Sequence, residues 1–183
     1  LGAGQSYHNF GGMILRVPGR EGGTMRGSDE RVLSTIASRG ESILPFYRSM
    51  ITWRDLYTTW GSETDWHYGA RGILSFVNEL WTNRNITKGA EPSEAERASF
   101  AKYVLLNDGV VKWHEFDHPT YGKIEIGGMK KEFGRVPPSF LLEEECHRNM
   151  AFTLYHADQL PLLSIRDVQV EKLNGVLHKI WVT

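Results

Sequence analysis

The sequence predicts an α/β fold, because strand-like and helix-like segments follow one another along the chain. Apolar stretches typical of strands occur at residues 7–17 and 73–81, whereas helical periodicity and capping signals occur at residues 28–39 and 139–158. The length of 183 residues favours about one domain, and 40% hydrophobic with 23% charged residues is ordinary for a globular protein. We therefore expect one main core built from helices and a sheet.

The composition excludes several classes of protein. The formal net charge is −1 with acidic and basic residues mixed along the chain, which predicts no nucleic-acid partner. The apolar runs are far shorter than the roughly 18 residues that a membrane helix needs, so no membrane span is expected. Cys146 is the only cysteine, which excludes an internal disulfide and a zinc site built from cysteines.

The first half of the chain is predicted to hold two strands and one helix. The first strand-like stretch ends at Pro18 and is followed by a glycine-rich loop. Ser28 can cap a helix that runs to about Arg39, with acidic residues in its first turn. Residues 57–71 mix aromatic, glycine and polar residues and are interpreted as a long loop before the strand at 73–81.

The second half is predicted to contain two helices and further short strands. Ser93 and Glu96 form a capping box that marks a helix start. Residues 109–133 resemble two or three short strands with turns, and residues 139–158 form the last helix. Alternating apolar residues after Pro161 predict a C-terminal β segment.

Residues 114–118 match the H-E-x-x-H pattern of helical zinc proteases. In that motif two histidines one helical turn apart bind zinc. Here Pro119 follows His118 directly, and a residue before proline is disfavoured in a helix. Because the flanking residues are also typical of strands and turns, we interpret this segment as a histidine-rich turn between strands.

Glu79 and His8 are ambiguous when each is taken alone. Glu79 lies near the end of an apolar strand, on the face that also carries Ser75 and Val77, and a carboxylate there needs a partner or a task. An exposed glutamate at a strand end is the commoner case. His8 lies where a strand runs into Phe10, and a single histidine is more often a core or surface residue than a ligand.

Taken together, these residues resemble the zinc metallocarboxypeptidases of the carboxypeptidase A/B type. Residues 57–80 read YTTWGSETDWHYGARGILSFVNEL, and Glu79 lies 22 residues after Tyr57. In that family a loop tyrosine, a Gly/Ser turn, Asp-Trp-x-Tyr, a glycine and Ser-Phe-x-x-Glu-Leu occur in this order. Residues 7–12, YHNFGG, resemble the family's strand with a zinc-binding histidine, and residues 138–155, PSFLLEEECHRNMAFTLY, resemble its closing helix.

The resemblance implies a role for each matching residue. His8 would be the third zinc ligand, and Glu79 the general base that takes a proton from zinc-bound water. Tyr57 would close over the C-terminal residue of a peptide substrate. Leu15, Thr64 and Val77 would line the pocket for that residue. The uncharged Thr64 stands where basic-specific members carry an acidic residue, which favours an uncharged, moderately apolar C-terminal residue.

The chain departs from the family pattern because it contains no His-x-x-Glu pair for the other two ligands. The resemblance places that pair, and the arginines that hold the substrate carboxylate, upstream of Leu1. Since a catalytic Zn²⁺ needs three protein ligands, we expect residues 1–183 alone to be inactive and to bind zinc weakly at best. The activity is expected of the longer parent protein, secreted or periplasmic by analogy.

The implied architecture is a partial α/β/α sandwich around a mixed twisted sheet. Residues 1–158 would be the later part of the catalytic domain, residues 82–136 an excursion from it, and residues 159–183 the truncated start of a β accessory domain. Two other functions stay open: a related zinc amidase that acts on cell-wall peptides or N-acyl amino acids, and a non-catalytic binding module. The sequence leaves the oligomeric state open.

Overall fold

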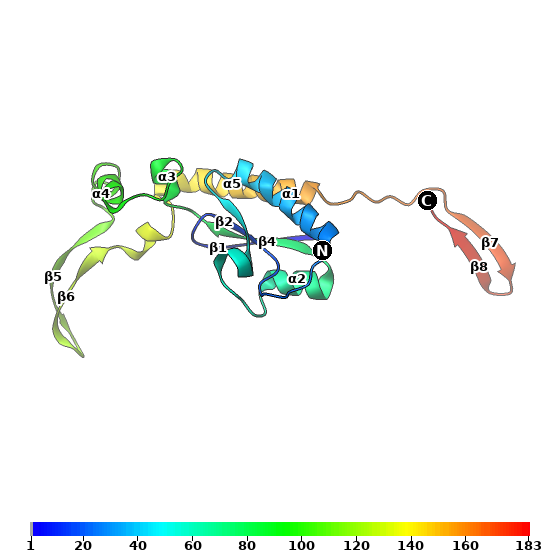
Figure 1. The fold of residues 1–183 in the computed structure, drawn as a ribbon, viewed down its shortest axis with the longest axis horizontal. Helices are drawn as coiled ribbons and strands as arrows, with labels where there is room; N and C mark the ends of the chain where they lie inside the picture. The colour runs from blue at the N-terminus through cyan, green and yellow to red at the C-terminus, as the bar shows by residue number, and fades with distance from the viewer. Residues whose placement is uncertain (1) are drawn as a thin grey trace.

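The computed structural model describes residues 2–183 and has a four-stranded mixed sheet with helices on both faces (Figure 1). Helices α1 and α5 cover one face and α2 covers the other. The strands lie in the order β1-β4-β2-β3. Their bounds are Ala3–Asn9 for β1, Met13–Arg16 for β2, Arg48–Ile51 for β3 and Leu74–Leu80 for β4. The expectations of an α/β fold and a mixed sheet are confirmed.

The strand directions bring the ends of β1 and β4 together. These two strands are parallel, and His8 lies beside Glu79 in the register. Strand β2 runs antiparallel to β4 and parallel to β3, so Met13 at its start lies beside Glu79. The single strand-like stretch expected at 7–17 is therefore two strands, which the turn at residues 10–12 separates.

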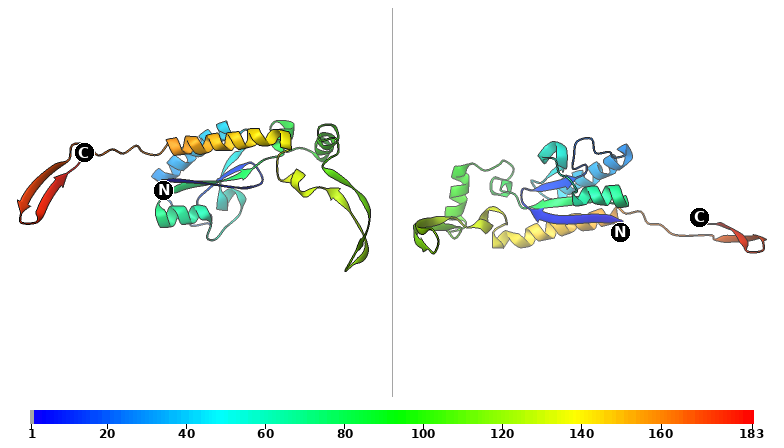
Figure 2. Two further views of the ribbon diagram at one scale, coloured as in Figure 1. Left: turned by 180° about the vertical axis from the view of Figure 1, so that it is seen from behind. Right: turned by 90° about the horizontal axis from the view of Figure 1, so that it is seen from below.

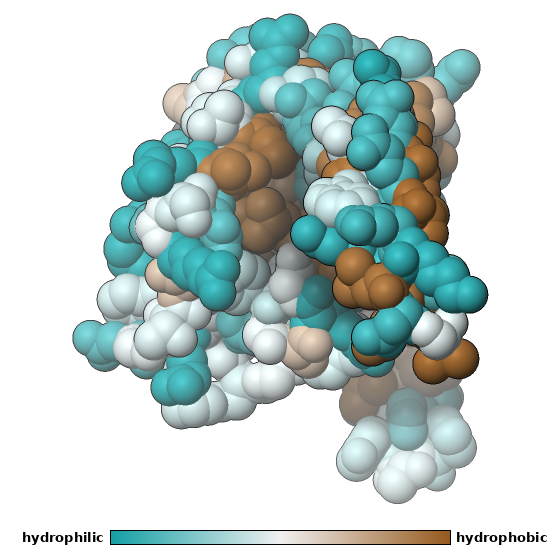
Figure 3. All heavy atoms as spheres, turned by 90° about the vertical axis from the view of Figure 1, so that its right-hand side faces the viewer, coloured by the Kyte–Doolittle hydropathy of each residue, from teal (hydrophilic) through white to brown (hydrophobic). Residues whose placement is uncertain are grey.

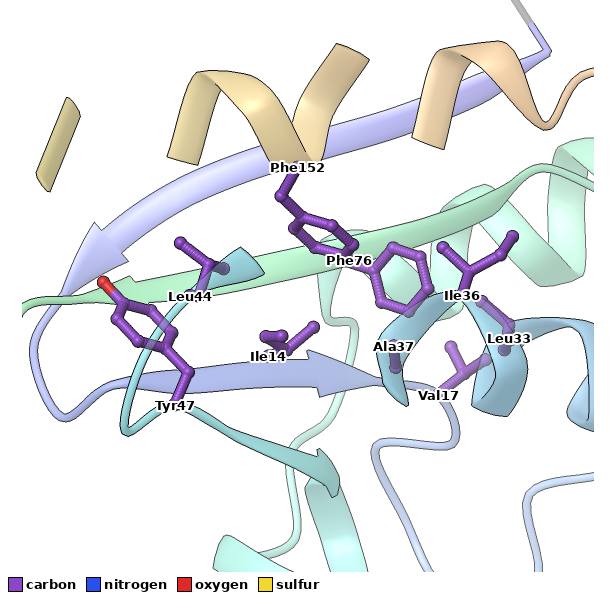
Figure 4. Close-up of a cluster of buried hydrophobic side chains, with 9 residues drawn as sticks. All are labelled: Ile14, Val17, Leu33, Ile36, Ala37, Leu44, Tyr47, Phe76 and Phe152. Atoms are coloured by element: carbon purple, nitrogen blue, oxygen red, sulfur yellow. The ribbon is translucent and has the colours of Figure 1, made fainter. Parts of the chain in front are cut away.

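The core lies between the sheet and the α1/α5 layer (Figure 4). The rings of Phe76 on β4 and Phe152 on α5 are 5.7 Å apart, and both are almost fully buried. Further members of the core come from β2, α1 and the segment before β3: Ile14, Val17, Leu33, Ile36, Ala37, Leu44 and Tyr47. Burial of these side chains is the main force that holds the helices on this face.

Helix α1 spans Gly27–Ile43 and differs from the expectation at both ends. Its N-cap residue is Arg26, and the hydroxyl of Ser28 donates to the carboxylate of Asp29, so Ser28 is not the cap. The helix continues four residues beyond Arg39, the expected end. Gly40 lies inside this extension, where a Cβ would come within 2.7 Å of the Phe152 ring. The close packing of α1 on α5 explains why glycine stands there.

Helix α2, Glu63–Arg71, lies within the segment that was expected to be a loop. Its start is capped by the Ser62 hydroxyl, which accepts a hydrogen bond from the Asp65 amide at 3.2 Å. Its end is capped by Gly72 in the left-handed conformation, with φ of 65°. A turn of π-helix, η1 at Thr52–Leu56, precedes the irregular residues 57–62. The loop interpretation of residues 63–71 was wrong.

The excursion, residues 82–136, extends from the end of β4 away from the sheet (Figure 2). It contains α3 (Arg84–Thr87) and α4 (Glu94–Tyr103), and the capping box predicted for α4 is present. Two antiparallel strands follow, β5 (Val110–His118) and β6 (Gly122–Met129), and then a 3₁₀ turn at Lys131–Gly134. Helix α5, Ser139–Asp158, returns the chain to the sheet with the predicted bounds.

The C-terminal residues form an antiparallel hairpin of β7 (Gln169–Asn174) and β8 (Leu177–Trp181), which confirms the predicted β segment. Every residue from 169 to 183 is exposed. In Figure 3, which faces this end of the molecule, apolar side chains are visible among hydrophilic ones. No helix of the described residues is both long and apolar enough to cross a membrane.

Candidate functional site

The structure brings His8 and Glu79 into contact at the ends of β1 and β4. The imidazole Nδ1 lies 3.2 Å from a carboxylate oxygen of Glu79. The His8 side chain is 70% exposed, whereas that of Glu79 is only 14% exposed. Because paired residues of neighbouring strands share a face, the parallel register places both side chains on the same face of the sheet. An exposed imidazole beside a shielded carboxylate can bind an incoming group and move a proton.

The hydrogen bonds of His8 define its neutral tautomer. Nδ1 also lies 3.0 Å from the carbonyl oxygen of Asn9. The carboxylate of Glu79 and this carbonyl are both acceptors, so Nδ1 must carry the ring proton in the neutral imidazole. The lone pair of Nε2 is then free to bind a metal ion. A histidine ligand commonly donates its other nitrogen to a carboxylate or a carbonyl in this way.

Leu15 and Val77, two of the three expected pocket residues, lie beside each other on the sheet. They are register partners on β2 and β4, and Val77 precedes Glu79 by two residues on the same face. Thr64 is buried in the first turn of α2, the helix that packs on β4. Leu15 is 7% exposed and Thr64 3% exposed, so little of either side chain is open to solvent.

Tyr57 lies apart from the pair of His8 and Glu79. It directly follows η1, which the chain enters from the end of β3. Since β3 runs antiparallel to β4, that strand ends on the side of the sheet away from Glu79. Tyr57 is 62% exposed. The structure thus assembles two of the three predicted reactive residues and leaves the third on an exposed loop.

Asp65, the aspartate of the Asp-Trp-x-Tyr pattern, joins α2 to the loop after β2. One carboxylate oxygen accepts a hydrogen bond from the Gly19 amide at 3.0 Å, and the other accepts one from the Ser62 hydroxyl at 2.7 Å. These bonds hold the start of the helix against the loop that follows β2.

The segment with the H-E-x-x-H pattern lies on β5, as the interpretation against a helix predicted. Residues four apart in a strand are about 13 Å apart, so His114 and His118 cannot bind one ion as the helical motif does. His118 instead accepts hydrogen bonds from the Thr120 and Tyr121 amides at 3.1 and 3.3 Å. It therefore stabilises the turn of the hairpin.

A buried polar network, which sequence reasoning missed, holds the end of β4. The Glu145 carboxylate on α5 accepts hydrogen bonds from the Tyr47 hydroxyl and, at 3.0 Å, from the Trp81 amide. The side chain of Asn149, one turn further along α5, donates to the backbone carbonyl of Glu145 at 3.0 Å. It also accepts a hydrogen bond from the side-chain amide of Asn78 at 2.9 Å. Burial, and then the charge of Glu145, raise the pKa of Tyr47 above its usual range. The phenol therefore stays protonated and donates.

A groove of about 630 Å³ runs between β1 and α5. His8 and Glu145 contribute to its lining, together with the apolar side chains of Leu142, Met150 and Leu154. Its walls come from β1, the last residue of β4, residues 135–137 and α5, and its lining does not include Leu15, Thr64 or Val77. The groove is therefore distinct from the expected pocket for the substrate side chain.

Comparison of the chain with models of known protein families found no match, and comparison with curated proteins found none either. Among the described residues, no group of three or more His, Cys, Asp and Glu side chains is arranged to hold a metal ion. His8 and Glu79 by themselves do not make up such a group.

Proposed function

We propose that this chain is part of a zinc-dependent metallocarboxypeptidase, an enzyme that hydrolyses C-terminal residues from peptides. The observation that supports this proposal is the contact between His8 and Glu79. These residues are 71 positions apart in the sequence, and the resemblance makes them a zinc ligand and the general base. The contact brings together the two residues that the resemblance assigns to one reaction. Because Glu79 accepts from Nδ1, across the ring from Nε2, its carboxylate would have to turn away from His8 to reach a metal-bound water.

Each residue has a defined task in the proposed reaction. A bound zinc ion would lower the pKa of its water to about 7. Glu79 would accept the proton and later donate it to the leaving amine. His8 would offer the Nε2 lone pair to the metal. The remaining two ligands and the arginines for the substrate carboxylate are proposed to lie upstream of Leu1.

The same proposal gives a substrate class. The resemblance makes Leu15, Val77 and Thr64 the lining of the pocket for the C-terminal side chain, and because none of them is charged, we propose peptides with an uncharged, moderately apolar C-terminal residue. Leu15 and Thr64 are buried, so this pocket would have to open to admit the side chain. Tyr57 would have to move from the opposite end of the sheet to close over a substrate at Glu79, and it lies on an exposed loop. By analogy, we place the parent protein outside the cytoplasm, in the periplasm or the secreted fraction.

The test is an assay of the full-length protein on N-acyl dipeptides with a free C-terminus. We expect hydrolysis that a chelator abolishes and zinc restores. Glu79→Gln should lower kcat by about 10²- to 10⁴-fold, the usual contribution of a general base. Glu115→Gln on exposed β5 is the matched control and should leave the rate unchanged.

Other outcomes would replace the proposal. Activity on N-acyl amino acids or cell-wall peptides, without activity on the dipeptides, would indicate the related amidase. Zinc-independent peptide binding without hydrolysis would indicate the binding module. Hydrolysis that survives Glu79→Gln would remove Glu79 from the mechanism.

A further inference from the structure

Arg84, in the excursion, contacts the turn that directly follows His8. Its guanidinium Nη2 donates to the carbonyl oxygens of Gly11 and Gly12, each at 3.1 Å. Nη2 and Nε also donate to the carbonyl of Phe46 at 2.7 and 3.0 Å. One half-buried side chain therefore joins the β1–β2 turn, residues 10–12, to the segment before β3.

The end of β4 binds the opposite edge of the same turn. The Gly11 amide donates to the carbonyl of Trp81 at 2.9 Å, and the Gly12 amide donates to the carbonyl of Glu79 at 2.8 Å. The amides of the turn are thus held by the end of the strand that carries Glu79. The carbonyls of the same turn are held by Arg84. The backbone bond to Glu79 ties this turn to the carboxylate residue itself.

The packing around Gly12 leaves the turn little freedom. Gly12 has φ of +64°, and a Cβ there would lie 2.6 Å from the Thr82 side chain and 3.2 Å from Nη2 of Arg84. Thr82 is 2% exposed. The Asn9 carbonyl, which accepts from Nδ1 of His8, is the last group before the turn. A shift of the turn would therefore change the hydrogen bonds of both His8 and Glu79.

We propose that Arg84 is a positioning residue of the His8/Glu79 site: it fixes the β1–β2 turn and so keeps the His8 imidazole against the Glu79 carboxylate. This inference rests on the proposed function, because it assigns a purpose to that contact. It also gives the start of the excursion a role at the site. Lysine is a weaker substitute here, since it has one ammonium nitrogen in place of Nε and Nη2 and lacks the planar fork that fixes the directions of these bonds.

The experiment compares Arg84→Lys with the wild-type chain by NMR. The matched control is Arg97→Lys, which alters an arginine on α4 that forms a single ion pair with Glu91. We expect amide exchange of Gly11 and Gly12 to accelerate about tenfold or more in Arg84→Lys, because charge-assisted hydrogen bonds are lost. The Gly72 amide, which bonds to the Tyr68 carbonyl at the end of α2, should not change.

The second measurement is the tautomer of His8, which long-range ¹⁵N–¹H spectra of the neutral ring report. We expect the Nδ1–H form in the wild type and in Arg97→Lys, and a shift toward the Nε2–H form in Arg84→Lys. A merely structural role of Arg84 would not move this signature. Unchanged glycine exchange and an unchanged tautomer in Arg84→Lys would overturn the proposal.

A wild-type measurement covers the case in which Arg84→Lys does not fold. In native-state exchange under low urea, the Gly11 and Gly12 amides should open together with the Gly89 amide, which bonds to the Arg84 carbonyl. Opening of the glycines in a unit separate from Gly89 would contradict the proposal. None of these readings requires zinc or activity, so they can fail or succeed independently of the peptidase assay.

Discussion

The sheet body and the two hairpins of this chain use the same kind of strand but differ in what covers them. We define the sheet body as residues 2–81 with α5, and the hairpins as β5–β6 and β7–β8. Phe76 in the body is 1% exposed, whereas Trp113 on β5 is 66% exposed and Ile180 on β8 is 60% exposed. Apolar residues at strand positions are therefore not sufficient for burial.

The difference shows where the stability of the molecule arises. In the body, two helices lie on the apolar face of the sheet and exclude water from it. Each hairpin has two strands without a covering layer in the described structure, and an isolated two-stranded hairpin is marginally stable at best. Substitutions of the same kind should consequently have unequal effects in the two regions.

The largest difference is expected between Phe152→Ala and Phe116→Ala. Phe152 is fully buried beside Phe76, so its truncation leaves a cavity and should lower the free energy of unfolding by about 3–5 kcal/mol. Phe116 on β5 is 42% exposed, and its truncation should cost under about 1 kcal/mol. Urea denaturation followed by far-UV circular dichroism measures both. Equal losses would mean that the hairpin shares the core's stability.

A smaller effect, of opposite sign at two sites, is expected for helical glycines within the body. In Gly40→Ala the new methyl would lie 2.7 Å from Phe152 and 2.8 Å from Ile14, so we expect a loss of about 1–3 kcal/mol. In Gly69→Ala on α2 the methyl meets no atom within 4 Å, and a gain of up to about 1 kcal/mol is expected. Thermal melting of the two variants gives the comparison. A stabilised Gly40→Ala would show that α1 can move away from α5.

The smallest expected effect is a pH dependence of the stability of the sheet body, which arises because His156 is buried. Burial lowers the pKa of His156 below the ordinary histidine value of about 6.5, so the folded protein resists protonation there. The unfolded chain binds the proton more readily, and stability should therefore be complete above about pH 6.5 and fall as the pH drops below it. Urea denaturation at pH 7.5 and 5.5 measures the slope.

His156→Leu should reduce this slope, since it removes the titrating group from its place against the Phe76 ring. His147→Gln, on an exposed position of the same helix, should retain it. A slope that is the same in His156→Leu and the wild type would assign the pH dependence to other groups.

Local patterns in the sequence were sufficient for several elements. The capping box at Ser93, the bounds of α5 and the strand around Phe76 were all predicted, because each signal lies within the element itself. Pro119 likewise identified residues 114–118 as non-helical. These are cases in which local chemistry and the tertiary structure agree.

The predictions from the sequence were wrong where tertiary packing or turn geometry determines the secondary structure. Helix α2 was missed because Gly69 and the aromatic residues hide its periodicity, although Ser62 and Gly72 carry both cap signals. Helix α1 was predicted too short because Gly40 normally weakens a helix, and only the approach of Phe152 explains it. The contact of His8 with Glu79 was proposed from a resemblance. No periodicity could have given it, because it depends on the register of two strands distant in sequence.

Because α5 returns to the sheet only after the excursion, the core can close only late in the synthesis of the chain. Tyr47 and Glu145, which bond across the core, are 98 positions apart, and the ribosome must deliver the excursion before α5 can pack. Until then the faces of Ile14 and Phe76 have no cover from α5 and are exposed to aggregation. Loop-closure entropy grows only with the logarithm of length, so shortening the excursion would change the equilibrium little. It would chiefly shorten the time for which the nascent sheet is unprotected.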